Sequence, residues 1–124
     1  RTANKGPDMS NHFLEHNVAV TAAWVVANAD RAGVHIIDVR PQPEFRGPLG
    51  HICGATSVPL EQLASHVARW CRRTPIVLVC RAGIRSDAAL ELLEDLGFTH
   101  AVNMTGGMLA FQRVPRRRPA SIAA

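Results

Sequence analysis

One cysteine in this sequence stands where nucleophilic chemistry is expected. Cys80 follows the apolar run Ile76–Val79 and opens a loop, residues 81–86, that leads into a helical pattern. Backbone N–H groups at the start of a helix lack partners and the helix dipole is positive there, so an anion is stabilised. Near cations at such a position the pKa of a thiol falls from about 8.5 to roughly 3.5–7.5. Arg81 and Arg85 are the cations, and we expect Cys80 to be a thiolate nucleophile.

The residues after Cys80 are expected to form its cradle. Gly83 is suited to the positive φ that turns successive N–H groups inward. Ser86 and Asp87 fall in the first helical turn, where we expect Ser86 to support the loop and Asp87 to cap the helix. This chemistry requires a thiol that solutes can reach. The predicted substrate-binding loop consists of Arg81, Ala82, Gly83, Ile84, Arg85 and Ser86.

This loop resembles the active-site loop of the rhodanese family of sulfurtransferases, and the other motifs that resemble the family occur in the expected order. They are Ile36-Ile37-Asp38-Val39-Arg40, Glu44-Phe45, Gly50-His51-Ile52-Cys53-Gly54-Ala55, Val58-Pro59-Leu60 and Asn103-Met104-Thr105-Gly106-Gly107-Met108-Leu109-Ala110-Phe111. The resemblance spans residues 17–113. It is closest to single-domain, thiosulfate sulfurtransferase-like members of the family.

The resemblance implies an activity and its partners. The Cys80 thiolate takes sulfane sulfur from thiosulfate or a persulfide donor and passes it to a thiol or to cyanide. The implied partners are a small anionic donor, whose charge the arginines attract, and a thiol acceptor, either a small molecule or a protein. Neither a cofactor nor a metal is implied. The alternative is a rhodanese-like binding or regulatory module without catalysis.

Loop length separates sulfur transfer from chemistry on oxyanions. Phosphatases related to rhodaneses have five residues between cysteine and arginine, which suits a tetrahedral phosphate. Here four residues, 81–84, separate Cys80 from Arg85. The smaller ring suits one sulfur atom, so sulfur transfer is favoured over a phosphatase or an arsenate reductase.

Four further residues are candidates for a second catalytic group. Asp38, Arg40, Glu44 and His51 lie in the motifs listed above, where the resemblance implies that they brace the loops around the site. An ion pair between Arg40 and Glu44 is the simplest expectation. His51 is expected to be a hydrogen-bonded loop anchor rather than a general base.

The pattern of elements predicts an α/β domain with a small, mostly parallel sheet covered by helices on both faces. Short unbroken apolar runs alternate with amphipathic stretches, which is typical of such sheets. Thr21 is a suitable N-cap. The expected strands cover residues 34–39, 55–58, 75–79 and 101–104, and the expected helices cover residues 21–32, 60–71, 85–96 and 107–113. Cys80 then lies at the carboxyl edge of the sheet, where ligands bind in this class of fold.

Length and composition fit one domain. The chain has 124 residues and a net charge of +4, part of which comes from arginines near its end. Three cysteines are too few for a disulfide framework and favour a reducing, cytoplasmic location. No apolar run reaches the roughly 20 residues that span a bilayer, and we expect neither a membrane nor a nucleic-acid partner. We expect residues 1–16 to be a leader, in which residues 1–8 are either a cloning remnant or native, residues 17–113 to be the domain, and residues 114–124 to be a basic, disordered tail.

Overall fold

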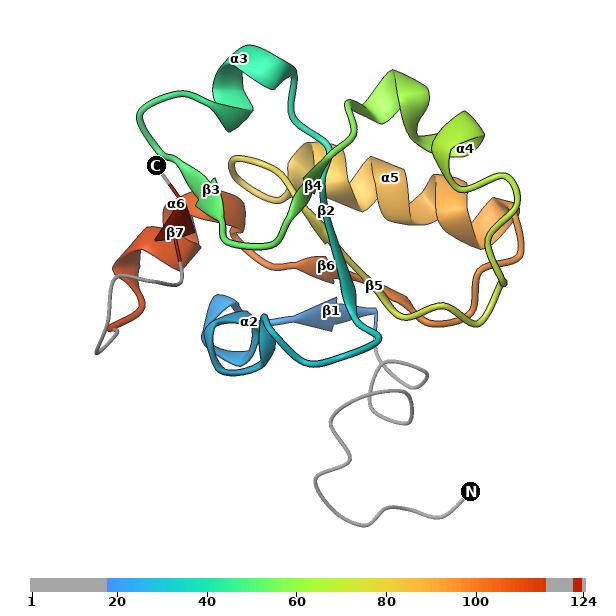
Figure 1. Ribbon diagram of the computed structural model, residues 1–124, viewed down its shortest axis with the longest axis horizontal. Coiled ribbons are helices and arrows are strands. Elements are labelled where there is room, and N and C mark those ends of the chain that lie inside the picture. Colours follow the sequence, from blue (N-terminus) through green and yellow to red (C-terminus); the bar gives the residue numbers. More distant parts are fainter. Residues whose placement is uncertain (1–17, 116–121, 124) are drawn as a thin grey trace, which may run out of the picture.

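The computed structural model describes residues 18–115 and 122–123. Their helices and strands mostly alternate along the chain (Figure 1). In chain order they are β1 (Ala19–Val20), α2 (Ala22–Asn28), β2 (His35–Asp38), α3 (Gln42–Phe45), β3 (His51–Ile52), β4 (Thr56–Ser57), the 3₁₀ helix η1 (Leu60–Gln62), α4 (Leu63–His66), β5 (Ile76–Val79), α5 (Ile84–Asp95), β6 (Ala101–Met104), α6 (Gly107–Arg113) and β7 (Ile122–Ala123).

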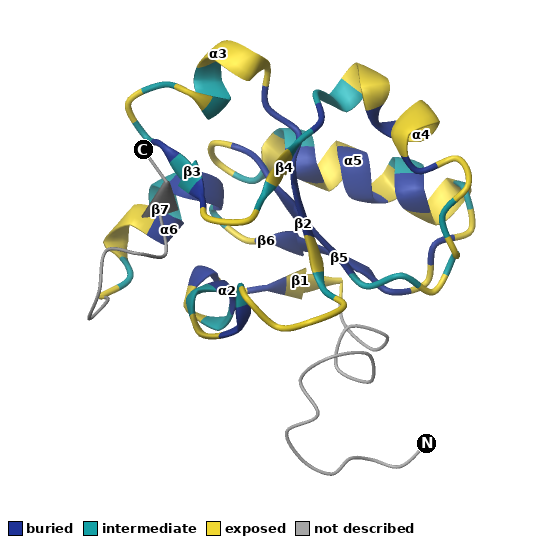
Figure 2. Cartoon of the chain, in the orientation of Figure 1, coloured by how far each residue is buried: buried dark blue, intermediate teal, exposed yellow. Residues whose placement is uncertain are grey.

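The main sheet is parallel. Its five strands run in the order β1-β6-β5-β2-β4, and each neighbouring pair is parallel. The central strand β5 is buried along its whole length (Figure 2). Because parallel strands all end at one edge, the loops after β2 and β5 lie side by side there, with Asp38 level with Val79. This arrangement confirms the predicted fold class.

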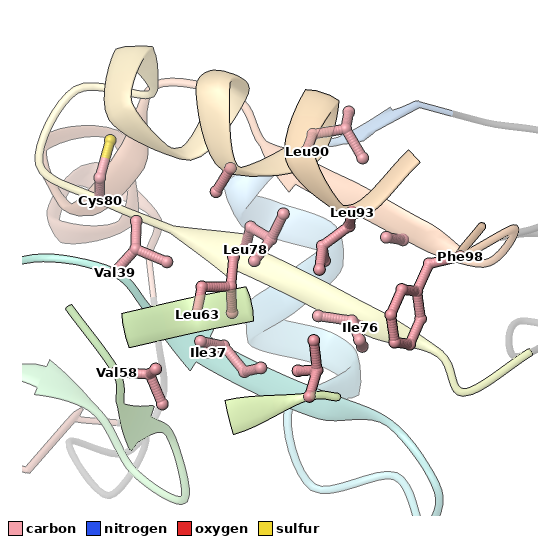
Figure 3. Packing of buried hydrophobic residues seen from close by; sticks show 13 residues of the cluster. Ile37, Val39, Val58, Leu63, Ile76, Leu78, Cys80, Leu90, Leu93 and Phe98 are labelled. Carbon is pink, nitrogen blue, oxygen red and sulfur yellow. The ribbon is translucent and has the colours of Figure 1, made fainter. Parts of the chain in front are cut away.

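Side chains of β5 alternate between two cores, which fixes the direction in which Cys80 points. Ile76, Leu78 and Cys80 belong to a cluster with residues of α4 and α5 (Figure 3). Val77 and Val79 belong to the cluster on the opposite face, with residues of α2 and α6. Because the period of a strand is two residues, Cys80 faces the same side as α5, and its side chain lies close to the start of that helix.

Two predicted helices are shorter than the sequence suggested. Thr21 caps α2 as predicted, by accepting a hydrogen bond from Trp24 N–H at 3.0 Å, but α2 ends at Asn28 rather than at residue 32. The predicted helix over residues 60–71 is replaced by η1 and α4, which ends at His66. The Arg72 guanidinium donates to the carbonyls of Val67, Ala68 and Trp70, and thereby satisfies carbonyl groups at and beyond the end of α4.

Several short elements were not anticipated, namely β1, α3, β3 and β7. Their lengths of two to four residues leave no periodic pattern to detect. The predicted leader, residues 1–16, lies outside the described residues. So does most of the predicted tail, within which Ile122–Ala123 pairs antiparallel with β3. In the described part of the chain, no helix has the length and apolar character needed to cross a bilayer.

Candidate active site

The Cys80 sulfur is surrounded by hydrogen-bond donors from its own loop. Gly83 N–H donates to Sγ at 3.1 Å, and Ser86 reaches Sγ with both its backbone N–H and its hydroxyl, each at 3.3 Å. Gly83 is the N-cap of α5 and Ser86 lies in its first turn. The unpaired N–H groups of a helix start therefore point at the sulfur, as the sequence predicted.

These donors favour the thiolate. Burial opposes ionisation of Cys80, but the hydrogen bonds from the Ser86 hydroxyl and from the N–H groups of Ser86, Gly83 and Ala82 outweigh it, and the pKa of the thiol lies below its ordinary value. The stabilisation comes mainly from hydrogen bonds rather than from the arginine side chains that the sequence analysis emphasised.

Access to the thiol differs from the expectation. Cys80 is only 1% exposed, and Gly83 and Ser86 of its loop are both in contact with its sulfur. The exposed residues of the loop are Arg81, Ala82 and Ile84. A reagent therefore reaches Sγ only when the loop moves.

The start of α6 holds the other side of the loop. Met108 N–H donates to the Cys80 carbonyl at 2.8 Å, and Leu109 N–H donates to the Arg81 carbonyl at 3.0 Å. This contact requires glycine at position 107, where an added Cβ would lie 2.5 Å from the Cys80 carbonyl oxygen and where φ is +58°. Gly106 and Gly107, both with positive φ, thus permit a tight turn between β6 and α6 and also let α6 approach the loop closely.

The predicted ion pair between Arg40 and Glu44 is wrong. Arg40 is buried and pairs with Asp38, with Nη2 2.7 Å from Oδ2 and Nε 2.9 Å from Oδ1. Glu44 instead forms a bidentate pair with Arg85 across the site. The backbone explains the difference, since Arg40 turns inward at the end of β2, whereas Pro41 and the short helix α3 carry Glu44 outward toward α5.

Arg40 and His51 both act as braces. Arg40 Nη2 also donates to the Gly50 carbonyl at 2.8 Å, so the buried pair fixes the segment between α3 and β3. His51 Nδ1 donates to the Phe45 carbonyl at 2.9 Å, and its ring stacks on that of Phe45. His51 is thus a hydrogen-bonded anchor, as expected.

A cavity of about 390 Å³ adjoins the loop. It is lined by Arg40, Glu44, Pro48, Leu49 and Arg81. Two of its charged groups are already paired, Arg40 with Asp38 and Glu44 with Arg85. Arg81, which is exposed, is the lining residue placed to attract an anion entering the cavity.

Comparison with known proteins gives the family. Residues 21–114 match the rhodanese-like domain. The chain belongs to this family. It is 39% identical over 80 residues to the uncharacterized protein YqhL of Bacillus subtilis, covering 62% of each protein. It is 32% identical over 87 residues to the thiosulfate sulfurtransferase GlpE of Shewanella oneidensis, covering 70% of this chain and 84% of that protein.

Solved structures agree with the fold of this rhodanese-like domain. A rhodanese-like domain protein from Staphylococcus aureus superimposes with a TM-score of 0.67 at 28% identity, over 77% of this chain and 91% of that one. A rhodanese-like domain from Anabaena has a TM-score of 0.71 at 23% identity, over 87% and 89% of the two chains, and supports the fold alone.

Sequence reasoning missed one buried polar residue of the site. Asn103 on β6 accepts a hydrogen bond from the Ser86 hydroxyl at 2.5 Å and donates to the Gly83 carbonyl at 3.2 Å. An asparagine inside the otherwise apolar strand Ala101–Met104 was the available signal. Cys53, which lies outside the loop, is exposed and forms no disulfide.

Proposed function

We propose that this rhodanese-like domain is a sulfurtransferase that carries sulfane sulfur on Cys80. The observation that supports this most directly is the convergence of the Gly83 and Ser86 donors on Sγ. A lowered thiol pKa gives the nucleophile that the first step needs. The sulfurtransferase GlpE, which is similar over 70% of this chain, gives independent support.

The first step would load the thiol. The Cys80 thiolate attacks the outer sulfur of thiosulfate, a new S–S bond forms to Sγ, and the S–S bond of the donor breaks. Its electron pair leaves with sulfite. The outer sulfur of the persulfide then carries the negative charge, and the N–H groups of the loop are placed to stabilise it. Because Cys80 is 1% exposed, this step requires the loop to open locally.

The second step would return the enzyme to its starting state. A thiolate or cyanide attacks the outer sulfur, the persulfide S–S bond breaks, and its electron pair returns to Cys80. Sulfur transfer of this kind uses no cofactor or metal, and free thiols fit a reducing compartment such as the cytoplasm. Arg81 would attract the anionic donor into the adjoining cavity.

The experiment compares the wild-type protein with Cys80→Ser. We expect thiosulfate to add the mass of one sulfur atom to the wild type, cyanide to remove it as thiocyanate, and the variant to do neither. Cys53→Ser is the matched control, because it removes an exposed thiol outside the loop. If the folded wild type gains no sulfur from thiosulfate or from a glutathione persulfide, the non-catalytic binding module replaces this proposal. Turnover of an aryl phosphate or of arsenate would instead indicate an oxyanion enzyme.

A further inference from the structure

Asn103 contacts two of the residues whose N–H groups point at the Cys80 sulfur, Gly83 and Ser86. Its side chain is buried, with the residue 9% exposed, and it comes from β6, level with Leu78 of β5. Its Nδ2 donates to the Gly83 carbonyl and its Oδ1 accepts from the Ser86 hydroxyl. A carbonyl can only accept, so the Gly83 contact fixes the orientation of the amide and leaves Oδ1 facing Ser86.

The Ser86 hydroxyl therefore has one hydrogen and two acceptors. Asn103 Oδ1 lies 2.5 Å from Oγ, whereas Cys80 Sγ lies 3.3 Å from it. Two oxygens at 2.5 Å require a hydrogen between them. The hydrogen that stabilises the thiolate is thus shared between Cys80 Sγ and Asn103 Oδ1.

We propose that Asn103 is a positioning residue, which draws the Ser86 hydroxyl hydrogen away from Cys80 and so limits the fraction of thiolate in the resting site. The proposal rests on the proposed function in one respect, namely that Cys80 is the reactive thiol. Removal of the Asn103 acceptor frees the Ser86 hydroxyl to donate fully to Sγ, so the thiol becomes more acidic.

The loop also has contacts with α6 that do not involve Asn103. The Cys80 and Arg81 carbonyls remain bonded to Met108 and Leu109 N–H at 2.8 and 3.0 Å. Gly83 also stays against α6, since a Cβ there would lie 3.1 Å from Gly106 N. Several independent contacts thus hold the loop in the absence of the amide of Asn103.

The charged groups around Cys80 are guanidinium and carboxylate groups. Arg81 and Arg85 lie on the loop and on α5, and Glu44 faces Arg85 from α3. The buried pair of Asp38 and Arg40 lies at the end of β2. Guanidinium and carboxylate groups ordinarily titrate outside pH 6–9. His51 is bonded to the Phe45 carbonyl on the α3–β3 segment.

The test measures the rate of Cys80 alkylation by iodoacetamide against pH, with no sulfur donor present, in a background of Cys53→Ser and Cys71→Ser. In Asn103→Leu the midpoint of the alkylation rate against pH should move to lower pH by about 0.5 to 1 unit, as expected for one further hydrogen bond to a charged sulfur. Asn103→Asp keeps the acceptor for Ser86 and adds negative charge, so its midpoint should move to higher pH. Asn28→Leu, which removes a buried asparagine of α2, is the matched control and should leave the midpoint unchanged.

A Ser86→Ala background separates positioning from a structural role. There, Asn103→Leu should no longer shift the midpoint, because no hydroxyl remains to be released. An unchanged or higher midpoint in Asn103→Leu, or a shift that survives in Ser86→Ala, would overturn the proposal. If the leucine variant does not fold, Asn103→Ala carries the same expectation. Because the alkylation assay contains no sulfur donor, its result can be interpreted even if the protein does not transfer sulfur.

Discussion

The Glu44 carboxylate and the Arg85 guanidinium meet in a bidentate pair, with Nη1 to Oε2 and Nη2 to Oε1 both at 2.9 Å. The pair joins α3 to the start of α5 and thus closes one side of the nucleophile loop. The hydrogen bond from Arg85 holds the pKa of Glu44 below its ordinary value, against the opposing effect of burial. Of the two loop arginines that the sequence analysis named as cations, Arg85 is therefore already neutralised by Glu44.

Removal of the negative charge of Glu44 should make the site more attractive to anions. In Glu44→Gln, Arg85 keeps its charge but loses its anionic partner, so the KM for thiosulfate should fall by about two- to fivefold, the equivalent of 0.5–1 kcal/mol. The free energy of unfolding should fall by no more than about 1 kcal/mol, because both side chains are more than a third exposed, at 37% and 39%. Glu91→Gln, an exposed residue of α5, makes the same charge change away from the pair. A higher KM for thiosulfate in Glu44→Gln would mean that the ion pair is needed to orient the Arg85 side chain for donor binding.

Arg81 should be the more important of the two loop arginines for donor binding. It lines the cavity and is exposed. In Arg81→Gln we expect the KM for thiosulfate to rise by about five- to tenfold, with the difference from wild type shrinking at high salt because screening weakens the attraction. Steady-state kinetics at two salt concentrations measure this, and Arg69→Gln, which removes an exposed arginine elsewhere, should have no such effect. A loss confined to kcat would instead assign Arg81 to the chemical step.

Ionisation of Cys80 should show in both reactivity and stability. Because its pKa is lowered in the folded chain, the midpoint of its alkylation should lie below the ordinary value of about 8.5. A lowered pKa adds stability that is present above the unfolded value and is lost as pH falls through the folded value. The free energy of unfolding should therefore rise with pH in that window, and Cys80→Ser should remove this part of the rise. A midpoint above 8.5 would show that burial outweighs the donors of the loop.

Local patterns predicted the position of the nucleophile but not the partners of the charged residues. The run Ile76–Val79 and Gly83 are adjacent to Cys80 in the chain, so strand, turn and helix start could be read in order. Arg40 and Glu44 lie four residues apart, which suggested a local pair. Their actual partners depend on the inward turn of Arg40 beside Asp38 and on where α3 lies relative to α5. Contacts of that kind, like the one between Asn103 and Ser86, follow from tertiary packing.

The close approach of α6 to the nucleophile loop yields the last prediction. Gly107 and Gly54 both have positive φ, +58° and +90°, so alanine is strained at either position, by about 1–2 kcal/mol. An added Cβ at Gly54 meets nothing within 4 Å, whereas at Gly107 it would lie 2.5 Å from the Cys80 and Arg81 carbonyl oxygens. Gly107→Ala should therefore push α6 off the loop and break the bonds from Met108 and Leu109 that hold it. We expect Gly54→Ala to lose only stability in urea unfolding, and Gly107→Ala to lose more stability and also the low-pH alkylation of Cys80. Equal alkylation curves in the two variants would show that the N–H cradle forms without support from α6, since the strain is common to both and the contact with the loop is not.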